Sequence, residues 1–128
     1  LIGKNFTDVN KNIRSLTIKD FLIVAPYNAQ VNFLLARLPE GTRCGTIDRF
    51  QGQEAPVTII SMTSSDLESL PRNKSFFFNS NRLNVAISRA QCLSIILINP
   101  KLLDSPPKTY EEFKLMNNFQ KLFKLTIK

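Results

Sequence analysis

The sequence predicts an α/β domain with a mostly parallel β-sheet flanked by helices. Two observations lead to this fold class. Short apolar runs, typical of strands that are covered on both faces, recur along the chain. Between them lie segments whose apolar residues are spaced three and four apart, as on one face of a helix. Strands that alternate with helices usually pair in parallel, because each helix returns the chain across the sheet.

The first strand is predicted in residues 21–26, FLIVAP, because this run is continuously apolar. Asn28 is a candidate N-cap for the helix that follows, and Pro39 and Gly41 are expected to end it. The apolar face of this helix would consist of Val31, Leu34, Leu35 and Leu38.

Two further strands are predicted in the middle of the chain. Residues 44–47 begin one, and residues 57–62, VTIISM, form the other. Asp48, with Gln51 three positions later, resembles a capping box and predicts a short helical turn. Residues 64–75 are rich in polar residues and predict a surface loop.

The second half of the chain predicts two helices and a strand. Residues 76–78 lead into a helix over residues 81–91, NRLNVAISRAQ, and residues 93–99, LSIILIN, are expected to be a fourth buried strand. Pro106 and Pro107 mark a break. A second capping box, Thr109 with Glu112, opens the last amphipathic helix. Its inward positions would be Phe113, Met116, Phe119 or Gln120, and Phe123, with Lys114, Lys121 and Lys124 on a solvated face.

The chain is therefore expected to be one domain in three parts. Residues 1–19 are an ill-defined lead-in, residues 21–100 form the core, and residues 101–128 form a C-terminal helical extension. A chain of 128 residues with 43% hydrophobic content is large enough to bury a core. The chain begins with Leu1 and not with Met, which suggests a fragment of a longer protein.

Composition indicates the kind of partner and excludes several kinds of site. Seventeen Lys and Arg against ten Asp and Glu give a formal charge of +7, which favours polyanions such as nucleic acid or nucleotide phosphates. The chain contains no histidine, which excludes a Ser-His-Asp triad and any histidine-bearing zinc site. We expect no metal ligands in this chain.

The cysteines and the apolar runs bear on the compartment. Cys44 and Cys92 fall in apolar runs and are expected to be buried free thiols of a reducing compartment, with the cytoplasm as the default. No apolar run approaches the length of a membrane span, and residues 1–10 lack the pattern of a signal peptide.

Arg82 and Arg89 are candidate phosphate-binding residues. They are seven positions apart, about two helical turns, so a helix over residues 81–91 would present both on one face. The apolar stripe of that helix is formed by Leu83, Ile87 and Ala90. A guanidinium group on a rigid helix suits the binding of phosphate or carboxylate. Taken alone, the pair is more simply explained as two arginines on a solvated face.

Unusual residues also follow the predicted strands. Ligands gather at the carboxyl ends of open parallel sheets, where residues 26–30, residues 46–54 and the segment through Arg89 are expected to meet. In GTIDRFQGQE, Gly52 would allow close approach to the backbone, and the other polar groups are Thr46, Asp48, Gln51, Gln53 and Glu54. Turn formation alone would also explain Gly45 and Gly52.

A phosphate cradle of the GxxxxGK[ST] type is absent, since Gly3 and Lys4 lack both the upstream glycine and a preceding strand. The chain therefore offers at most half of a nucleotide site. Arginines without a cradle suit a domain that reaches toward a nucleotide held by another domain.

Three runs in this order, IVAPYNAQ, GTIDRFQGQEAPVTIISM and NRLNVAISRAQ, resemble motifs IV, V and VI of superfamily 1 helicases. The resemblance covers roughly residues 21–100 and is strongest to the branch of RNA-surveillance and Okazaki-processing helicases. The AP after QGQE and the long loop before FFFNSNRLNVAISRA look closest to bacterial fusions of a RecB-like nuclease with such a helicase. The resemblance implies the C-terminal RecA-like domain, of P-loop-NTPase-like fold.

The resemblance also implies roles for residues. Arg89 would be the arginine finger that meets the γ-phosphate of ATP, with Arg82 in support. Nucleotide-binding positions would be Gln51, Gly52 and Glu54. Positions facing single-stranded nucleic acid would be Thr46, Asp48, Pro26, Tyr27 and Gln30. Asn81, Ser88 and Gln91 depart from the residues most frequent in the family.

The function implied is that of a second motor domain in an ATP-dependent helicase or translocase. ATP and Mg²⁺ would be held mainly by the N-terminal RecA-like domain, whose P-loop, acidic pair and adenine-stacking aromatic this chain lacks. The expected partner is single-stranded nucleic acid, DNA in preference to RNA, and the isolated chain is expected to be inactive. The alternative is a non-catalytic nucleic-acid-binding or interaction module that keeps the fold.

Overall fold

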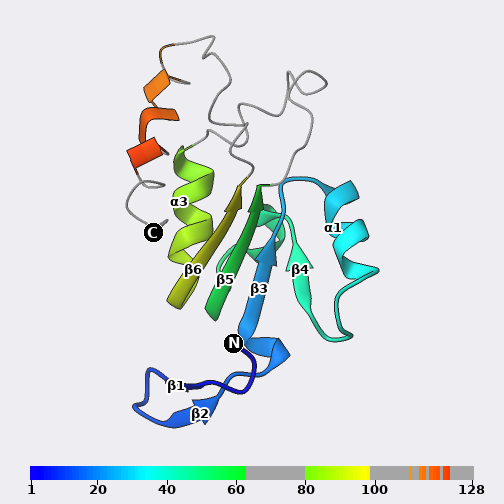
Figure 1. Ribbon diagram of the computed structural model, residues 1–128, viewed down its shortest axis with the longest axis vertical. Helices are drawn as coiled ribbons and strands as arrows, with labels where there is room; N and C mark the ends of the chain where they lie inside the picture. Colours follow the sequence, from blue (N-terminus) through cyan, green and yellow to red (C-terminus); the bar gives the residue numbers. More distant parts are fainter. Residues whose placement is uncertain (63–79, 99–109, 111–112, 115, 119, 122–128) are drawn as a thin grey trace.

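A four-stranded sheet forms the centre of the domain (Figure 1). The computed structural model describes residues 1–62, 80–98, 110, 113–114, 116–118 and 120–121. The strands of this sheet are β3 (Phe21–Val24), β4 (Arg43–Gly45), β5 (Ala55–Met62) and β6 (Ala90–Ile98). They lie in the order β4-β3-β5-β6, and every neighbouring pair is parallel. The predicted fold class is confirmed.

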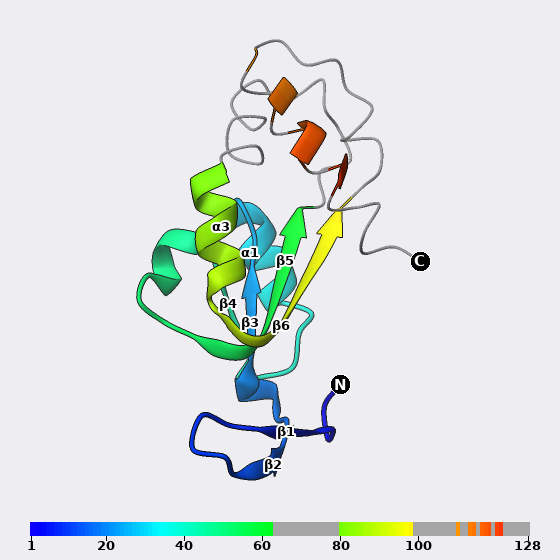
Figure 2. The same ribbon diagram turned by 90° about the vertical axis from the view of Figure 1, so that its left-hand side faces the viewer.

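Helices cover both faces of the sheet (Figure 2). Helix α1 (Asn28–Leu35) packs with Ile23 and Ala25 on one face. Helix α3 (Ser80–Ser88) and the 3-10 helix η2 (Ile47–Phe50) pack with Leu22 and Val24 on the other. Residues of β3 and the position after it contact opposite helices in turn, because successive side chains of a strand point to opposite faces of the sheet.

The predicted α1 begins and ends at different residues from those observed. Tyr27, with extended backbone, is the N-cap, so Asn28 is the first helical residue and not the cap. The helix ends at Leu35, which is 41% exposed, whereas Leu38 packs on the α1 side of the core from beyond the helix. Leu35 was expected to be buried, but this short helix presents a narrow face to the sheet.

Strand β4 is shorter than predicted because η2 begins directly after it. The N-cap of η2 is Thr46, so Asp48 lies inside the helix and the predicted capping box of Asp48 and Gln51 is wrong. Gly45 allows this tight turn, since a Cβ there would lie 2.8 Å from the Arg49 Cδ and 3.0 Å from the Phe50 Cε2. Ile47 was expected in the strand and is instead buried as part of η2.

Strand β6 begins at Ala90, so the predicted helix over residues 81–91 ends earlier, at Ser88. Ala90 pairs with Ala55, the first residue of β5. Strand β6 lies at the edge of the sheet, and Leu93 and Leu97 are 42% and 47% exposed. The expectation of a fully buried fourth strand is therefore wrong.

The lead-in that the sequence left undefined forms an antiparallel hairpin below the amino end of β3 (Figure 1). Its strands are β1 (Asn5–Thr7) and β2 (Ile13–Ser15), and the short helix η1 (Ile18–Asp20) connects it to β3. Arg14 and the buried Asp20 form a bidentate ion pair, with N–O distances of 2.8 and 2.6 Å. This pair links the hairpin to η1, directly before β3.

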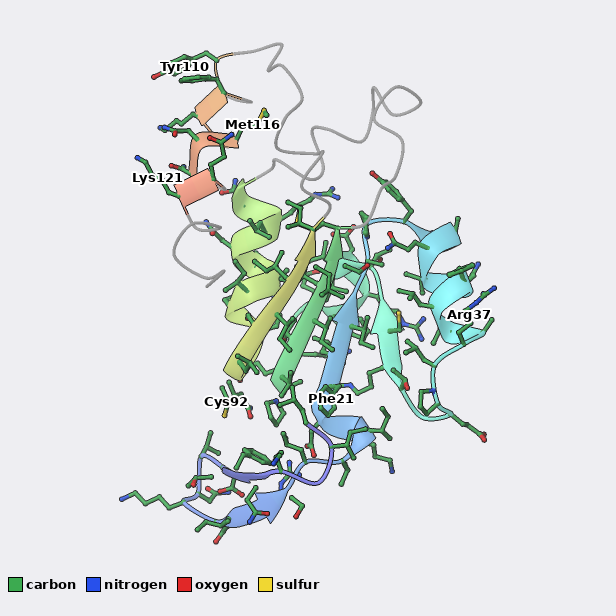
Figure 3. All side chains as sticks on the ribbon, in the orientation of Figure 1. Phe21, Arg37, Cys92, Tyr110, Met116 and Lys121 are labelled. Atoms are coloured by element: carbon green, nitrogen blue, oxygen red, sulfur yellow. The ribbon has the colours of Figure 1, made fainter. Side chains whose placement is uncertain are left out.

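The described residues of the C-terminal segment are helical and lie next to α3 (Figure 3). Met116 is buried in the same core cluster as Ala86 of α3, as predicted. Lys114 and Lys121 are exposed, also as predicted, whereas Phe113 is 55% exposed and not inward. Gln120 is exposed. Predictions for residues 64–75, 76–78, 106, 107, 109, 112, 119, 123 and 124 lie outside the described residues.

Both cysteines are free thiols. Cys44 is buried, and burial raises the pKa of its thiol. Cys92 is exposed because it lies near the start of the edge strand, so its predicted burial is wrong (Figure 3). Over the described part of the chain, every helix is too short or too polar to cross a membrane.

Candidate functional site

An open hollow lies between η2 and α3 and contains four of the residues singled out in the sequence. These four are Asp48, Gln51, Arg82 and Arg89, and the wall is completed by Ile47, Asn81 and Val85. The volume of the hollow is about 240 Å³. Sites that enclose a whole small molecule usually measure about 300–1,000 Å³. The hollow is thus large enough for one end of such a ligand.

Arg82 and Arg89 reach the hollow from different elements. Arg82 is in the first turn of α3, whereas Arg89 follows the last helical residue, Ser88. The prediction that both arginines leave one helix is therefore wrong for Arg89. It occupies the turn between α3 and β6, where the strand pairing of Ala90 ends the helix.

The backbone of Arg89 is held on both sides. Its carbonyl accepts a hydrogen bond of 3.0 Å from the amide of Ala55, and its amide donates to the Ala86 carbonyl at 3.4 Å. Its side-chain Nε is buried and has no hydrogen-bond acceptor among the described residues. A buried donor without an acceptor is costly, so such a group is a candidate ligand-binding atom.

The charge of the hollow is mainly positive. Two guanidinium groups and one carboxylate, that of Asp48, line it. Positive groups held on anchored backbone attract anions, and guanidinium groups bind phosphate oxygens with two parallel hydrogen bonds. The hollow is therefore suited to an anionic, phosphate-like group.

The remaining residues of the GTIDRFQGQE run lie outside the hollow. Gly52 and Glu54 are exposed on the segment that leaves η2 and returns to the start of β5. Gln53 accepts a hydrogen bond of 2.9 Å from Arg43 of β4. Gly52 has a φ of 77°, and a Cβ there would meet nothing within 4 Å. Its backbone is therefore open to approach.

The predicted meeting of three loops at the carboxyl edge of the sheet is only partly right. Pro26 is at that edge, after β3, and Thr46 follows β4. Arg89 lies instead at the amino edge, beside the start of β5. Because β4, β5 and β6 are parallel, each connection must cross the sheet, so residues at its far end reach the opposite edge.

The three residues predicted after the first strand have different surroundings. Pro26 is buried, and with Arg82 it lines a cavity of about 30 Å³. Tyr27 packs against the α3 side of the core, and burial raises the pKa of its hydroxyl to about 12. The side-chain amide of Gln30 donates a hydrogen bond of 2.8 Å to the Ser61 hydroxyl.

Residues 3–101 match the protein family described as "AAA domain". This match covers most of the chain. The chain belongs to the AAA domain family.

This AAA domain is also similar to parts of several helicases. It is 38% identical over 96 residues to "RNA helicase Mov10l1" of Mus musculus, covering 70% of this chain and 8% of that protein. It is 39% identical over 79 residues to "Uncharacterized ATP-dependent helicase C05C10.2" of Caenorhabditis elegans, covering 61% and 5%. For "Uncharacterized ATP-dependent helicase MJ0104" of Methanocaldococcus jannaschii the identity is 34% over 93 residues, covering 70% and 13%. The chain thus spans a small part of these relatives.

Three residues of the hollow were not predicted as site residues in this AAA domain. They are Ile47, Asn81 and Val85. Asn81, Val85 and Arg89 are spaced four apart, and the same spacing rule that placed Arg82 and Arg89 on one face would have found them. Ile47 could not be found in this way, because its burial depends on the early start of η2.

Acidic residues are sparse in the hollow. In the parts of the chain that the structure describes, no group of three or more Cys, Asp or Glu side chains could hold a metal ion. Asp48 is the one carboxylate among the residues that line the hollow. A divalent cation bound to a phosphate here would need its other ligands from elsewhere.

Proposed function

We propose that this AAA domain is the second RecA-like motor domain of an ATP-dependent helicase, with Arg89 as its arginine finger. The observation that carries this proposal is the hollow that Arg82 and Arg89 both line, with the buried Nε of Arg89 lacking an acceptor among the described residues. The similarity to parts of proteins named as ATP-dependent helicases supports it.

The residues of the hollow fit one end of a nucleoside triphosphate. When it is bound, ATP supplies a terminal phosphoryl group whose oxygens carry the charge that must be stabilised during transfer. Arg89 contributes a fixed positive charge from a backbone held at both its amide and its carbonyl. Arg82 adds a second charge from the start of α3. Charges that are already in position cost little reorganisation during the reaction.

The rest of the nucleotide would be held by an N-terminal RecA-like domain of the same parent protein. The hollow is too small for a whole nucleotide, and its single carboxylate is too few for Mg²⁺, which usually keeps oxygen ligands from carboxylates, phosphates and water. We therefore assign ATP and Mg²⁺ mainly to that domain. The isolated chain should then hydrolyse no ATP.

The single strand would lie along the carboxyl edge of the sheet, at the start of α1. Helix α1 begins directly after its N-cap Tyr27, and this amino end carries the positive end of the helix dipole. Such a site binds backbone phosphates without reading sequence. Thr46 follows β4 at the same edge. Asp48 was expected to face the single-stranded nucleic acid, but it lines the hollow, and we assign it there.

RNA is the substrate to test first. The sequence alone favoured DNA, but one of the relatives described above is named an RNA helicase, as is "Probable RNA helicase armi" of Drosophila melanogaster. A RecB-like nuclease fused to the parent and a cytoplasmic location remain predictions from the sequence.

The proposal is tested by replacing Arg89 with Ala in the full-length parent protein. ATP turnover should fall by roughly 10³- to 10⁵-fold, the range for arginine fingers, while ATP binding is largely kept. Arg89→Lys is the matched variant: it keeps a charge but loses the planar fork, so turnover should stay well below that of the parent. Unchanged turnover in Arg89→Ala would refute the assignment and favour the non-catalytic module.

A further inference from the structure

Ser61 is a buried polar residue in an otherwise apolar strand. It is 6% exposed and lies near the carboxyl end of β5, between Ile60 and Met62. Burying a hydroxyl among apolar side chains is unfavourable unless the hydroxyl is hydrogen-bonded. The hydroxyl is therefore the feature of Ser61 that needs an explanation.

The partner of this hydroxyl is on another element. The Gln30 Nε2 donates to the Ser61 Oγ at 2.8 Å, and the two residues are 31 positions apart in the sequence. Gln30 is the third helical residue of α1, so this bond ties the first turn of the helix to the sheet. The strand that leads into α1 is β3, and β5, which carries Ser61, is its neighbour in the sheet.

We propose that Ser61 is a positioning residue for nucleic-acid binding: through Gln30 it fixes the first turn of α1 at the carboxyl edge of the sheet. This inference rests on the proposed function, in which that turn receives the backbone of the single strand. It also changes the role expected for Gln30: its side-chain amide binds Ser61 and does not contact the nucleic acid.

The physical basis is the short length of α1. The helix has eight residues, and among its own residues only Val31 is buried. A helix anchored by so few buried side chains can shift or fray at its ends. The bond from Gln30 to Ser61 adds a fixed point within the turn whose amides would meet phosphate.

Thr58 provides a matched control on the same strand. It is fully buried, and its Oγ1 has no hydrogen-bond partner among the described residues. Thr58→Val removes a buried hydroxyl from β5 at nearly constant shape, and touches no link to α1. Any effect common to Ser61→Ala and Thr58→Val therefore reports on β5 itself.

The experiment uses the full-length parent and measures ATP turnover against the concentration of single-stranded RNA, with a parallel DNA series. Ser61→Ala should raise the RNA concentration for half-maximal stimulation by about two- to tenfold, the size expected for one hydrogen bond. Turnover without RNA should be unchanged. Ser61→Thr, which keeps the hydroxyl, should resemble the parent, as should Thr58→Val.

If RNA and DNA both fail to stimulate ATP turnover of the unaltered parent, the proposed function fails. If they do stimulate the parent, the inference alone fails in either of two cases. In the first, Ser61→Ala needs the same RNA concentration as the parent; in the second, Thr58→Val needs as much more RNA as Ser61→Ala does. Should Ser61→Ala not fold, Gln30→Leu tests the same bond from the other side. Where both single variants fold, the double variant Ser61→Ala with Gln30→Leu should need no more RNA for half-maximal stimulation than either single variant. Additive increases would mean that Gln30 contacts the nucleic acid itself and would overturn the inference.

Discussion

Arg82 and Arg89 stand at opposite ends of α3 and line the same hollow. Seven positions of helix rise by roughly 10 Å, and both long side chains nevertheless line this hollow. Arg82 belongs to the helix, whereas the backbone of Arg89 is hydrogen-bonded to the start of β5. The hollow thus combines a charge on a helix with a charge fixed to the sheet.

Arg82→Ala in the full-length parent should lower ATP turnover on the order of 10²-fold, less than Arg89→Ala. The side chain of Arg82 is exposed, so water screens its charge more than that of the half-buried Arg89. The measurement is the turnover number at saturating ATP. Arg37→Ala is the control, because Arg37 packs over the Phe33 ring on α1, on the other face of the sheet (Figure 3). An equal loss in both variants would contradict the role of Arg82.

Gly52→Val should abolish most of the ATP turnover of the parent, whereas Gly41→Val should not. Both glycines have positive φ, 77° and 88°, and a Cβ at either would meet nothing within 4 Å. The two variants should therefore lose similar stability from backbone strain, about 1–3 kcal/mol. Only Gly52 lies where a ligand is expected to approach. Equal turnover in the two variants at matched folded fraction would exclude that approach.

The stability of the domain should fall between about pH 4 and pH 2 because of Asp20. Hydrogen bonds from Arg14, and then from Thr17, lower the pKa of its carboxyl from 3.8 to about 2. A carboxyl with a lowered folded pKa stabilises the fold above its unfolded pKa and loses this contribution as the pH falls through the folded value.

Asp20→Asn should destabilise the domain by roughly 1–3 kcal/mol at pH 7 and flatten the pH dependence in that range. Urea unfolding at several pH values measures both effects. If the unaltered domain and Asp20→Asn showed the same slope between pH 4 and pH 2, the ion pair with Arg14 would contribute nothing to stability.

The core strands could be predicted from the sequence because their pattern is local. The runs FLIV and VTIISM lie in β3 and β5, and both strands are buried along their whole length except at Ile59. A long apolar run between polar segments has few alternatives to a strand covered on both faces. The amphipathic pattern of α3 was local in the same way, with Leu83 and Ile87 packed against the core.

The ends of elements could not be predicted, because they depend on contacts between distant residues. Helix α3 stops at Ser88 since Ala90 pairs with Ala55, and η2 starts early since Gly45 admits the Phe50 ring. The exposure of Cys92 and Leu93 follows from the position of β6 at the sheet edge, which is a property of strand order. The pattern of a single strand does not contain that order.

The sequence by itself determined the fold class, the order of the elements from β3 to β6 and the presence of two arginines suited to phosphate. These depend on residue types and on spacings within one segment. The tertiary structure decided that Asp48, Gln51, Arg82 and Arg89 share one hollow and that Ser61 holds Gln30. Parallel strands require the chain to cross the sheet between them, so only the packed crossovers bring these residues together.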